Sequence, residues 1–268
     1  DAITVRYFSG EYWDVVDDND PDADTYEAGN DAKYMTAVNE FAIVSTEDGH
    51  PDATDSANNF APGELLAISN CVRSDIFQLT TQCASSNTSF GCAPNGRIRH
   101  ENGGGPAGVT PGNAGGGNFS DIYGQGSKVR RYMAARYFIG NGSYGGPSLF
   151  REYPVLNNVT HTITINTQEL LEGVENMQIM YGADIDGDGV PENYLAAGAA
   201  GLTLPAEWAT VATVKIALLL RTVQQGFASG VDTKNNYDLL GQAIDPVDLA
   251  VKRRVVSSTI QLRNRIFR

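Results

Sequence analysis

The chain alternates between apolar and polar residues over many short segments, and this pattern restricts it to a fold built mainly from strands. Side chains of a strand point alternately to the two faces of its sheet, so a period of two indicates a strand with one buried face. Many short strands joined by polar segments predict antiparallel sheets. The strand-like segments are residues 3–7, 41–44, 65–68, 76–79, 129–139, 177–181, 214–220 and 254–262.

Helix signals are few, so the expected fold class is α+β with strands dominating. Thr167–Glu172 starts with a capping residue and is followed by Gly173, which predicts one or two helical turns. Pro205–Trp208 predicts the start of another short turn, because proline fits the first turn of a helix. No long amphipathic helix is evident.

The charge and hydropathy of the chain exclude some partners. The sequence has 19 basic and 32 acidic residues, and its net charge of −13 argues against nucleic acid or anionic lipid as the main partner. No run of about 18 apolar residues exists, so no segment is expected to span a membrane. The sequence opens directly into a strand-like segment without an initiator methionine or a signal peptide, so we expect a processed or truncated chain.

The segment with the clearest chemistry is DIDGDGVPE, residues 184–192. Carboxylates at its first, third and fifth positions, with Gly189 allowing a sharp turn at the sixth, are typical of loops that wrap calcium. Carboxylates about 5 Å apart in water repel by roughly 0.8 kcal/mol per pair, which disfavours the compact loop without a cation. We therefore predict a Ca²⁺ site. Its expected ligands are the side chains of Asp184, Asp186, Asp188 and Glu192 and the backbone carbonyl of Val190.

The match to a full EF-hand loop is incomplete. Position 12 of such a loop carries a bidentate glutamate, but here it is Leu195. Residues 177–181, before the loop, alternate as in a strand and not as in an entering helix. The alternative is an acidic hairpin turn, because Asp-Gly is itself a strong turn signal. A turn needs only one Asp-Gly pair, so the three spaced aspartates favour calcium.

A second acidic segment, residues 14–31, contains five further aspartates between positions 17 and 24. Their spacing could form another cation site, but no turn glycine lies among them, and we favour a solvated acidic loop.

The three cysteines lack the spacing of a zinc site, and the histidines are scattered. An oxidised pair fits the extracytoplasmic character of the composition. Cys83 and Cys92 enclose a short polar loop and are the favoured pair, and Cys71 with Cys92 is the alternative. The remaining thiol is expected to be buried, because free cysteine packs like a small hydrophobic residue.

Motifs of known catalytic and nucleotide sites are incomplete or missing. Residues 140–145, GNGSYG, fit the pattern G-x-G-x-x-G, but Gly146 and Pro147 follow where a dinucleotide site needs a helix. We interpret this segment as a glycine-rich loop. The sequence has no G-x-S-x-G elbow, no H-E-x-x-H motif and no P-loop, and we expect no enzymatic activity.

Several segments together resemble the PilW family of type IV minor pilins. Residues 171–182, LEGVENMQIMYG, are similar to a family stretch that begins with EGVE and ends with Tyr-Gly. Residues 253–265, RRVVSSTIQLRNR, are similar to the C-terminal segment of the family. The resemblance covers most of the chain. Further matching segments are residues 1–7, 69–71, 75–78, 184–193, Trp208 and 214–221.

The resemblance implies a type IV pilin-like fold, in which an N-terminal hydrophobic helix precedes a globular domain with an antiparallel sheet. That helix is missing here, so we expect a single globular domain, residues 1–268, with insertions at about 10–33, 101–127 and 223–248. Family members are low-abundance subunits that prime pilus assembly and lie at or near the fibre tip. The resemblance therefore implies a role in assembly and interaction, not in catalysis.

The resemblance also implies partners and a location. The partners are other minor and major pilins and a tip adhesin, and the protein is anchored in the inner membrane by the missing helix before assembly into the extracellular pilus. Two alternatives remain open from the sequence: a calcium-dependent secreted adhesin or binding module, and the homologous minor pseudopilin of type II secretion. The residues preceding Asp1 would separate a pilin, with a short leader and a hydrophobic helix, from a secreted adhesin.

Overall fold

In the computed structural model, the chain divides into two compact units. Unit 1 comprises residues 1–4, 136–152 and 167–268, and unit 2 comprises residues 5–135 and 153–166. The expectation of a single domain with three insertions stays a prediction. The structure describes residues 1–16, 40–45, 60–70, 72–83, 97–100, 102–105, 107–114, 119–121, 123, 126–223, 232, 234, 236–246 and 250–262.

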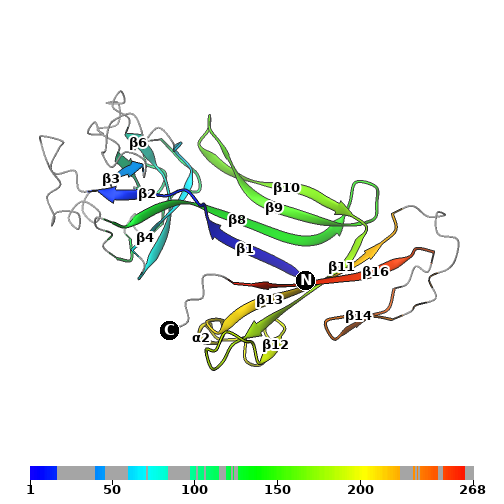
Figure 1. The fold of residues 1–268 in the computed structure, drawn as a ribbon. Coiled ribbons are helices and arrows are strands. Elements are labelled where there is room, and N and C mark those ends of the chain that lie inside the picture. The colour runs from blue at the N-terminus through cyan, green and yellow to red at the C-terminus, as the bar shows by residue number, and fades with distance from the viewer. Residues whose placement is uncertain are drawn as a thin grey trace, which may run out of the picture. The chain divides into compact units, whose positions relative to one another are not determined.

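Strands dominate both units, and the strands pair antiparallel, as the sequence predicted (Figure 1). Four strands contribute residues to both units: β1 (Ala2–Phe8), β8 (Lys128–Asn141), β9 (Pro147–Asn157) and β10 (Thr162–Glu172). Among the described residues, helix is confined to α2 (Pro205–Trp208), which confirms the short turn expected there. No helix in the described parts of the chain has the length and apolar character needed to span a membrane.

Unit 2 contains short strands around an aromatic core. They are β2 (Trp13–Val16), β3 (Glu40–Ser45), β4 (Leu65–Ser69), β5 (Ser74–Gln78), β6 (Thr81–Cys83) and β7 (Arg97–Arg99). β4 and β5 form a hairpin, and β2 and β4 each pair with the first residues of β8. In β2 and β4, alternate residues point into this core, as expected for strands with a buried face. The buried side chains are Trp13, Val15, Phe60, Leu66, Ile68, Phe77, Leu79, Tyr123 and Val129.

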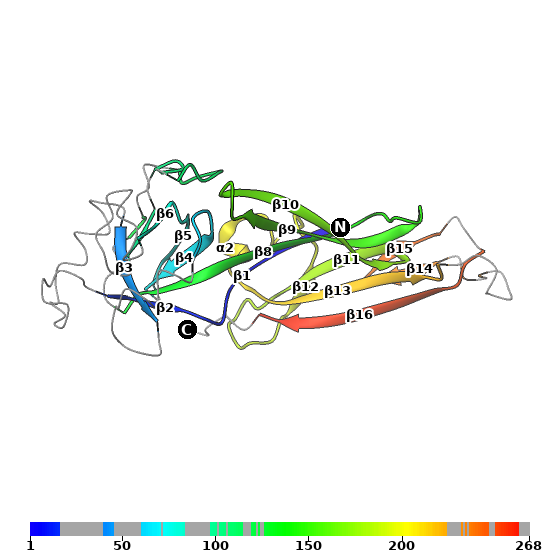
Figure 2. The same ribbon diagram turned by 90° about the horizontal axis from the view of Figure 1, so that it is seen from above.

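Unit 1 contains a four-stranded antiparallel sheet in the order β12-β11-β13-β16 (Figure 2). Its strands are β11 (Val174–Ala183), β12 (Asn193–Leu195), β13 (Val211–Arg221) and β16 (Arg253–Gln261). β13 lies between β11 and β16, which confirms that the apolar run from 214 to 220 is a central strand. β13 pairs with β16 without a register shift from Thr213 to Arg221.

Both faces of β13 are covered, and this explains its nearly continuous apolar sequence. On one face, Val214 packs with Met177 and Ile179 of β11, and side chains of the β8–β9 hairpin, including Ile139 and Leu149, join this cluster. On the other face, buried side chains of β13 pack against a small hairpin formed by β14 (Tyr237–Leu239) and β15 (Gln242–Ile244). The residues of this second cluster are Ala217, Leu219, Tyr237 and Leu239.

The short helix predicted over Thr167–Glu172 is wrong, because β10 runs through these residues beside β9. Pairing in a sheet satisfies the backbone groups that a short helix would leave open, and it outweighs a weak local capping signal. Gly173, expected as a helix cap, has a φ of +78° in the tight turn from β10 to β11. A Cβ there would lie 2.6 Å from the Arg221 carbonyl oxygen, so the turn depends on a glycine.

Strands also lie inside two of the predicted insertions. β2 falls within the first, and the β14–β15 hairpin falls within the third. The turn of this hairpin uses Leu240 and Gly241, both with positive φ (56° and 89°). A two-residue turn with both φ values positive suits the twist of a hairpin. Glycine adopts a positive φ readily and leucine rarely does, so only the second turn position has the residue type expected for such a turn.

A buried ion-pair network links Asp232, in the predicted insertion at about 223–248, to the four-stranded sheet of unit 1. The Arg253 side chain is 0% exposed and donates to both oxygens of Glu175, with an Nη2–Oε1 distance of 2.8 Å. Its Nη1 lies 3.3 Å from Oδ2 of Asp232, whose side chain is 8% exposed. Tyr237 donates its hydroxyl to the same Asp232 oxygen at 2.8 Å. A charge this deeply buried is tolerated because it is paired and hydrogen-bonded.

The titration of two groups in this network follows from its geometry. Burial opposes the charged form of Asp232, but hydrogen bonds from Tyr237, from the Lys234 backbone and from Arg253 lower its pKa below the ordinary value. The pKa of Tyr237 is raised, first by burial and then by its hydrogen bond to Asp232. Asp232 is therefore an anion at neutral pH and Tyr237 remains a hydrogen-bond donor.

Replacing the buried arginine tests the contribution of this network to stability. Arg253→Met should lower the free energy of unfolding by about 3 kcal/mol, because it leaves Glu175 and Asp232 as buried charges without their main partner. The neighbouring Arg254 is exposed, and Arg254→Met should change the same quantity by no more than about 0.5 kcal/mol. Equilibrium urea unfolding of both variants measures the difference. Equal effects of the two substitutions would contradict a stabilising role for the network.

Candidate functional site

The acidic loop, residues 184–192, connects β11 to β12 within unit 1. The Glu192 N–H donates to the Ala183 carbonyl (3.0 Å), and the Asp184 N–H donates to the Thr210 carbonyl, just before β13 (2.9 Å). Ala183 also pairs with Asn193 across the β11–β12 hairpin. The strand expected before the loop is confirmed, and the loop is a hairpin connection whose two ends are held by the sheet.

The loop brings four predicted ligand side chains together. Asp184, Asp186, Asp188 and Glu192 each offer a carboxylate oxygen, and these oxygens all lie within 4.8 Å of one another. Asp184 is the least exposed of the four, and the other three are exposed. Like charges at such distances repel each other, so the loop concentrates negative charge at one point of the surface.

Backbone amides of the loop orient these carboxylates. Asp184 accepts from the N–H groups of Gly187 (2.8 Å) and Gly189 (3.0 Å), one on each of its oxygens. Asp186 accepts from the Asp188 N–H at 3.2 Å, and Asp188 accepts from the Val190 N–H at 2.7 Å. These are successive turns closed by aspartate side chains, and they turn the carboxylates toward the inside of the loop.

Glu192 closes the loop from its other end. Its Oε2 accepts from the Ile185 N–H at 2.7 Å, so the last acidic residue returns to the second position of the loop. Its carboxylate is thereby brought to the three aspartates, although Glu192 lies seven positions after Ile185 in the sequence.

Two glycines permit the tight path of the backbone. Gly189, at the sixth position, has a φ of +90°, and Gly187 has a φ of +82°. Both angles lie in the left-handed region, which glycine adopts at little cost and other residues adopt only with strain. The sharp turn predicted at Gly189 is confirmed, and Gly187 is a second turn position that the sequence-based comparison with calcium loops did not include.

The donor set suits a hard divalent cation. The four clustered side chains supply only carboxylate oxygens, and Ca²⁺ takes six to eight oxygen ligands from carboxylates, carbonyls and water in flexible geometries. Mg²⁺ demands a smaller and more regular octahedron, and Zn²⁺ prefers nitrogen and sulfur ligands. The clustered residues, all oxygen donors, therefore suit Ca²⁺ or Mg²⁺ better than Zn²⁺. The Val190 carbonyl as a ligand stays a prediction.

Other predicted site residues are placed only in part. Cys71 and Cys92 lie outside the described residues, and Cys83 is described only by its backbone position in β6, so the disulfide pairing stays a prediction. Most of the second acidic segment, from residue 17 on, also lies outside the described residues. Residues 140–145 form the turn region between β8 and β9, and the strand that follows is consistent with a glycine-rich loop.

The role of Thr210 was not visible in the sequence. Its carbonyl holds the first residue of the acidic loop, although the two residues are separated by β12 and α2. Every residue has a backbone carbonyl, so the identity of Thr210 does not reveal this contact. The β11–β13 register brings the carbonyl beside Asp184.

Comparison with known proteins gives one match. The model of the family PilW, Type IV Pilus-assembly protein W, matches residues 136–264, nearly half of the chain. The matched range includes β11, β13, β16 and the acidic loop. No curated protein and no solved structure matches the chain significantly.

Strain at the loop glycine can be tested without any ligand. Gly187→Ala should lower the free energy of unfolding by about 1–2 kcal/mol, because alanine is strained at a φ of +82° although the space around the position is open. Gly10→Ala is the matched control, since its surroundings are equally open and its φ lies outside the left-handed region. Urea unfolding measures both. A neutral effect of Gly187→Ala would show that the loop does not hold this conformation in solution.

Proposed function

Because the chain belongs, through residues 136–264, to the PilW family of type IV pilus-assembly proteins, we propose that it acts as a minor pilin that helps to assemble the pilus. The family match is the observation that carries this proposal. A pilus-assembly protein works in the cell envelope or outside the cell and contacts other pilus components. We further propose that this chain acts through such contacts and not through catalysis.

The finer parts of the proposal are a role in priming assembly and a place at or near the fibre tip. The similarity of residues 171–182 and 253–265 to the family supports both. In the structure, residues 174–182 form most of β11 and residues 253–261 form β16, and these two strands flank β13. These two strands belong to one sheet, and other minor and major pilins are the proposed partners of this part of the chain.

We also propose that the acidic loop binds Ca²⁺ through Asp184, Asp186, Asp188 and Glu192. The proposal is supported by four carboxylate oxygens within 4.8 Å and by the backbone turns that hold them there. A cation would remove the mutual repulsion of the carboxylates, which otherwise opposes this loop conformation. Outside the cell, where calcium is millimolar, even a weak site fills, and at ten times its dissociation constant a ligand adds about 1.4 kcal/mol to folded-state stability.

The position of the loop gives a bound calcium ion a possible way to act on contacts between subunits. Its ends are held by β11 and by the residue before β13, so an ion bound there would clamp the connection after β11. Ile185 and Val190 are apolar side chains on this loop that are 67% and 63% exposed. We propose that the ion orders these exposed side chains as part of a surface that a neighbouring pilin contacts. Stabilisation of the fold alone is the competing role.

Calcium binding should depend on the clustered aspartates. Asp186→Asn keeps the size of an exposed ligand but removes its charge, and it should weaken calcium binding by about tenfold, since charge count sets the affinity of such sites. Asp245→Asn changes an exposed aspartate outside the cluster and should leave the affinity unchanged. Isothermal titration and the thermal shift with millimolar calcium measure both. Absence of any heat or shift with the unchanged chain would contradict a calcium site.

Contact with other pilus subunits should be recoverable from cells. The tagged chain, expressed in its source organism, should capture other pilus subunits, and a calcium chelator should reduce their recovery if the loop orders the contact surface. Asp186→Asn should reproduce the effect of the chelator, and Asp245→Asn should not. Equal recovery with and without chelator would leave calcium a stabilising role only. Failure to capture any pilus subunit would contradict the assembly role itself.

A further inference from the structure

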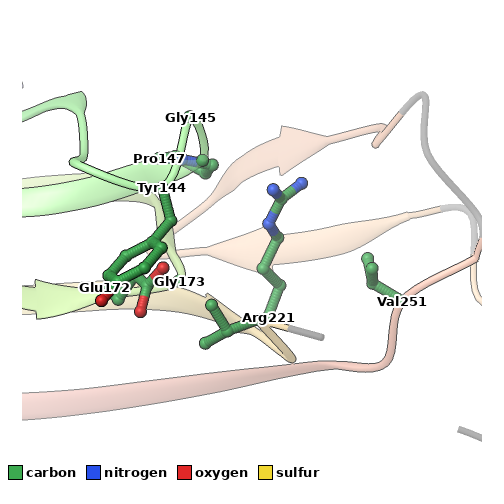
Figure 3. Close-up of a pocket in the computed structure, with 9 residues that line it drawn as sticks. Tyr144, Gly145, Pro147, Glu172, Gly173, Arg221 and Val251 are labelled. Atoms are coloured by element: carbon green, nitrogen blue, oxygen red, sulfur yellow. The ribbon is translucent and has the colours of Figure 1, made fainter. Parts of the chain in front are cut away.

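An open pocket of about 710 Å³ lies in unit 1, where the β8–β9 turn meets the β10–β11 turn and the end of β13 (Figure 3). The β8–β9 turn is the glycine-rich segment that the sequence singled out and that the proposed role in pilus assembly does not use. Tyr144 and Glu172 both line this pocket. In the described part of the chain, no hydrogen bond or ion pair engages the side chain of either residue.

Hydrogen bonds fix the frame of this pocket. The Gly173 N–H donates to the Pro147 carbonyl (2.9 Å), and the Arg221 N–H donates to the Gly173 carbonyl (2.8 Å). These bonds join the three segments that form the walls. The Glu169 carboxylate accepts from both the N–H (3.0 Å) and the hydroxyl (2.7 Å) of Ser143 and so secures the tip of the β8–β9 turn. The site is therefore largely preformed, as small-molecule sites usually are.

Arg221 forms one wall of the pocket, but its charge is already compensated within the protein. Its Nη1 lies 3.3 Å from Oε1 of Glu175, and its side chain is 21% exposed. Glu175 also pairs with Arg253, which pairs in turn with Asp232. The two arginines and the two carboxylates of this network balance each other. Arg221 therefore gives the pocket neither a free donor nor a counter-charge.

Glu172 is the uncompensated charge of the pocket. Of the described residues that line it, Glu172 supplies the only carboxylate and the engaged Arg221 supplies the only basic group. A carboxylate without a counter-ion attracts a cation, and the net charge of −13 on the whole chain adds to this attraction.

The ring of Tyr144 favours the same sign of charge. Figure 3 shows this ring and the Glu172 carboxylate at one side of the pocket and the Arg221 guanidinium at the other. Tyr144 is 86% exposed, so the face of its ring is open to a ligand. The face of an aromatic ring is electrostatically negative and attracts ammonium and guanidinium groups. Carboxylate and ring therefore select a cation together.

Apolar side chains complete the lining of the pocket. Pro147, Val223 and Val251 border it, and Val223 is 50% exposed. A metal ion gains nothing from such contacts, and one carboxylate does not supply the several oxygen ligands that Ca²⁺ or Mg²⁺ requires. A cationic group on an apolar stem gains from the carboxylate, the ring and the apolar side chains together.

We propose that this pocket binds an organic cation, an ammonium or guanidinium group carried on an apolar stem. The charged group lies against the Glu172 carboxylate and the face of the Tyr144 ring, and the stem contacts Val223. A lysine or arginine side chain of another protein and a free quaternary ammonium compound share this chemistry. Such binding depends neither on calcium nor on the proposed role in pilus assembly.

Titration of the complete 268-residue chain with small cations, followed by saturation-transfer NMR, tests the pocket directly. The probes are Nα-acetyl-lysine methylamide, Nα-acetyl-arginine methylamide and choline, and Nα-acetyl-norleucine methylamide is the neutral counterpart of the lysine probe. At least one cation should bind with a millimolar dissociation constant, because one carboxylate and one ring on an open surface give a weak site. The norleucine probe should bind at least about tenfold more weakly, since it lacks the charge. Tighter binding of an amino-acid amide indicates a protein side chain as the ligand, and tighter binding of choline indicates a free quaternary ammonium compound.

Substitutions in the pocket should weaken binding of the cation. Tyr144→Ala should weaken it about threefold to tenfold, because it removes the ring, whereas Tyr144→Phe keeps the ring and should stay within about twofold of the unchanged chain. Glu172→Gln keeps the size of the side chain but removes its charge, and it should weaken binding about tenfold. The matched controls are Tyr7→Ala and Glu11→Gln, which remove an exposed ring (51%) and an exposed carboxylate (75%) outside the pocket and should leave binding unchanged.

Thermal unfolding of each variant shows whether it is folded, so that lost binding is not mistaken for lost structure. The proposal is overturned if none of the three cations binds or if the norleucine probe binds as tightly as the best cation. It is also overturned if Tyr144→Ala and Glu172→Gln both bind like the unchanged chain.

Discussion

The antiparallel pairing of β11 with β13 is the constraint on which the rest of unit 1 depends. Its register places Ala183 opposite Val211 at one end and Val174 opposite Leu220 at the other. The acidic loop begins directly after the first end, where the Thr210 carbonyl holds Asp184. The pocket lies at the second end, where Arg221 meets the turn at Gly173. One pair of strands thus positions the acidic loop and the pocket at its opposite ends, and a shift in its register would disturb both.

The two faces of the same sheet explain how this pair is kept in register. A slip by one residue would turn every inward side chain outward, and β13 has apolar contacts on both faces that resist such a slip. The ion pairs of Arg253 with Glu175 and Asp232 add directional contacts between β16, β11 and the segment before β14. The chain therefore uses charge in two ways: balanced and buried in this network, and concentrated at the surface in the acidic loop.

The secondary structure of segments with one clear sequence pattern was predicted correctly. Alternating segments such as 3–7 and 254–262 became β1 and β16, and Pro205–Trp208 became α2. In the acidic loop, the spacing of the aspartates and the turn at Gly189 followed from the sequence, because the loop is local and its turns are closed by its own side chains. The helix expected at Thr167–Glu172 failed for the opposite reason: its local signal was weak, and pairing beside β9 decided its conformation.

The sequence by itself determined the strand-rich character of the chain, the acidic loop and the resemblance to PilW. Each of these features depends on residues that are close together in the sequence. Only the tertiary structure decided which distant residues meet. It brought Thr210 to Asp184, joined Arg253 to Glu175 and Asp232, and gathered Tyr144, Glu172 and Arg221 around one pocket. These contacts arise from strand register, which depends on pairing between distant segments and not on the type of any one residue. The positive φ of Leu240 is likewise imposed by the strands that its turn connects, because leucine does not favour this conformation.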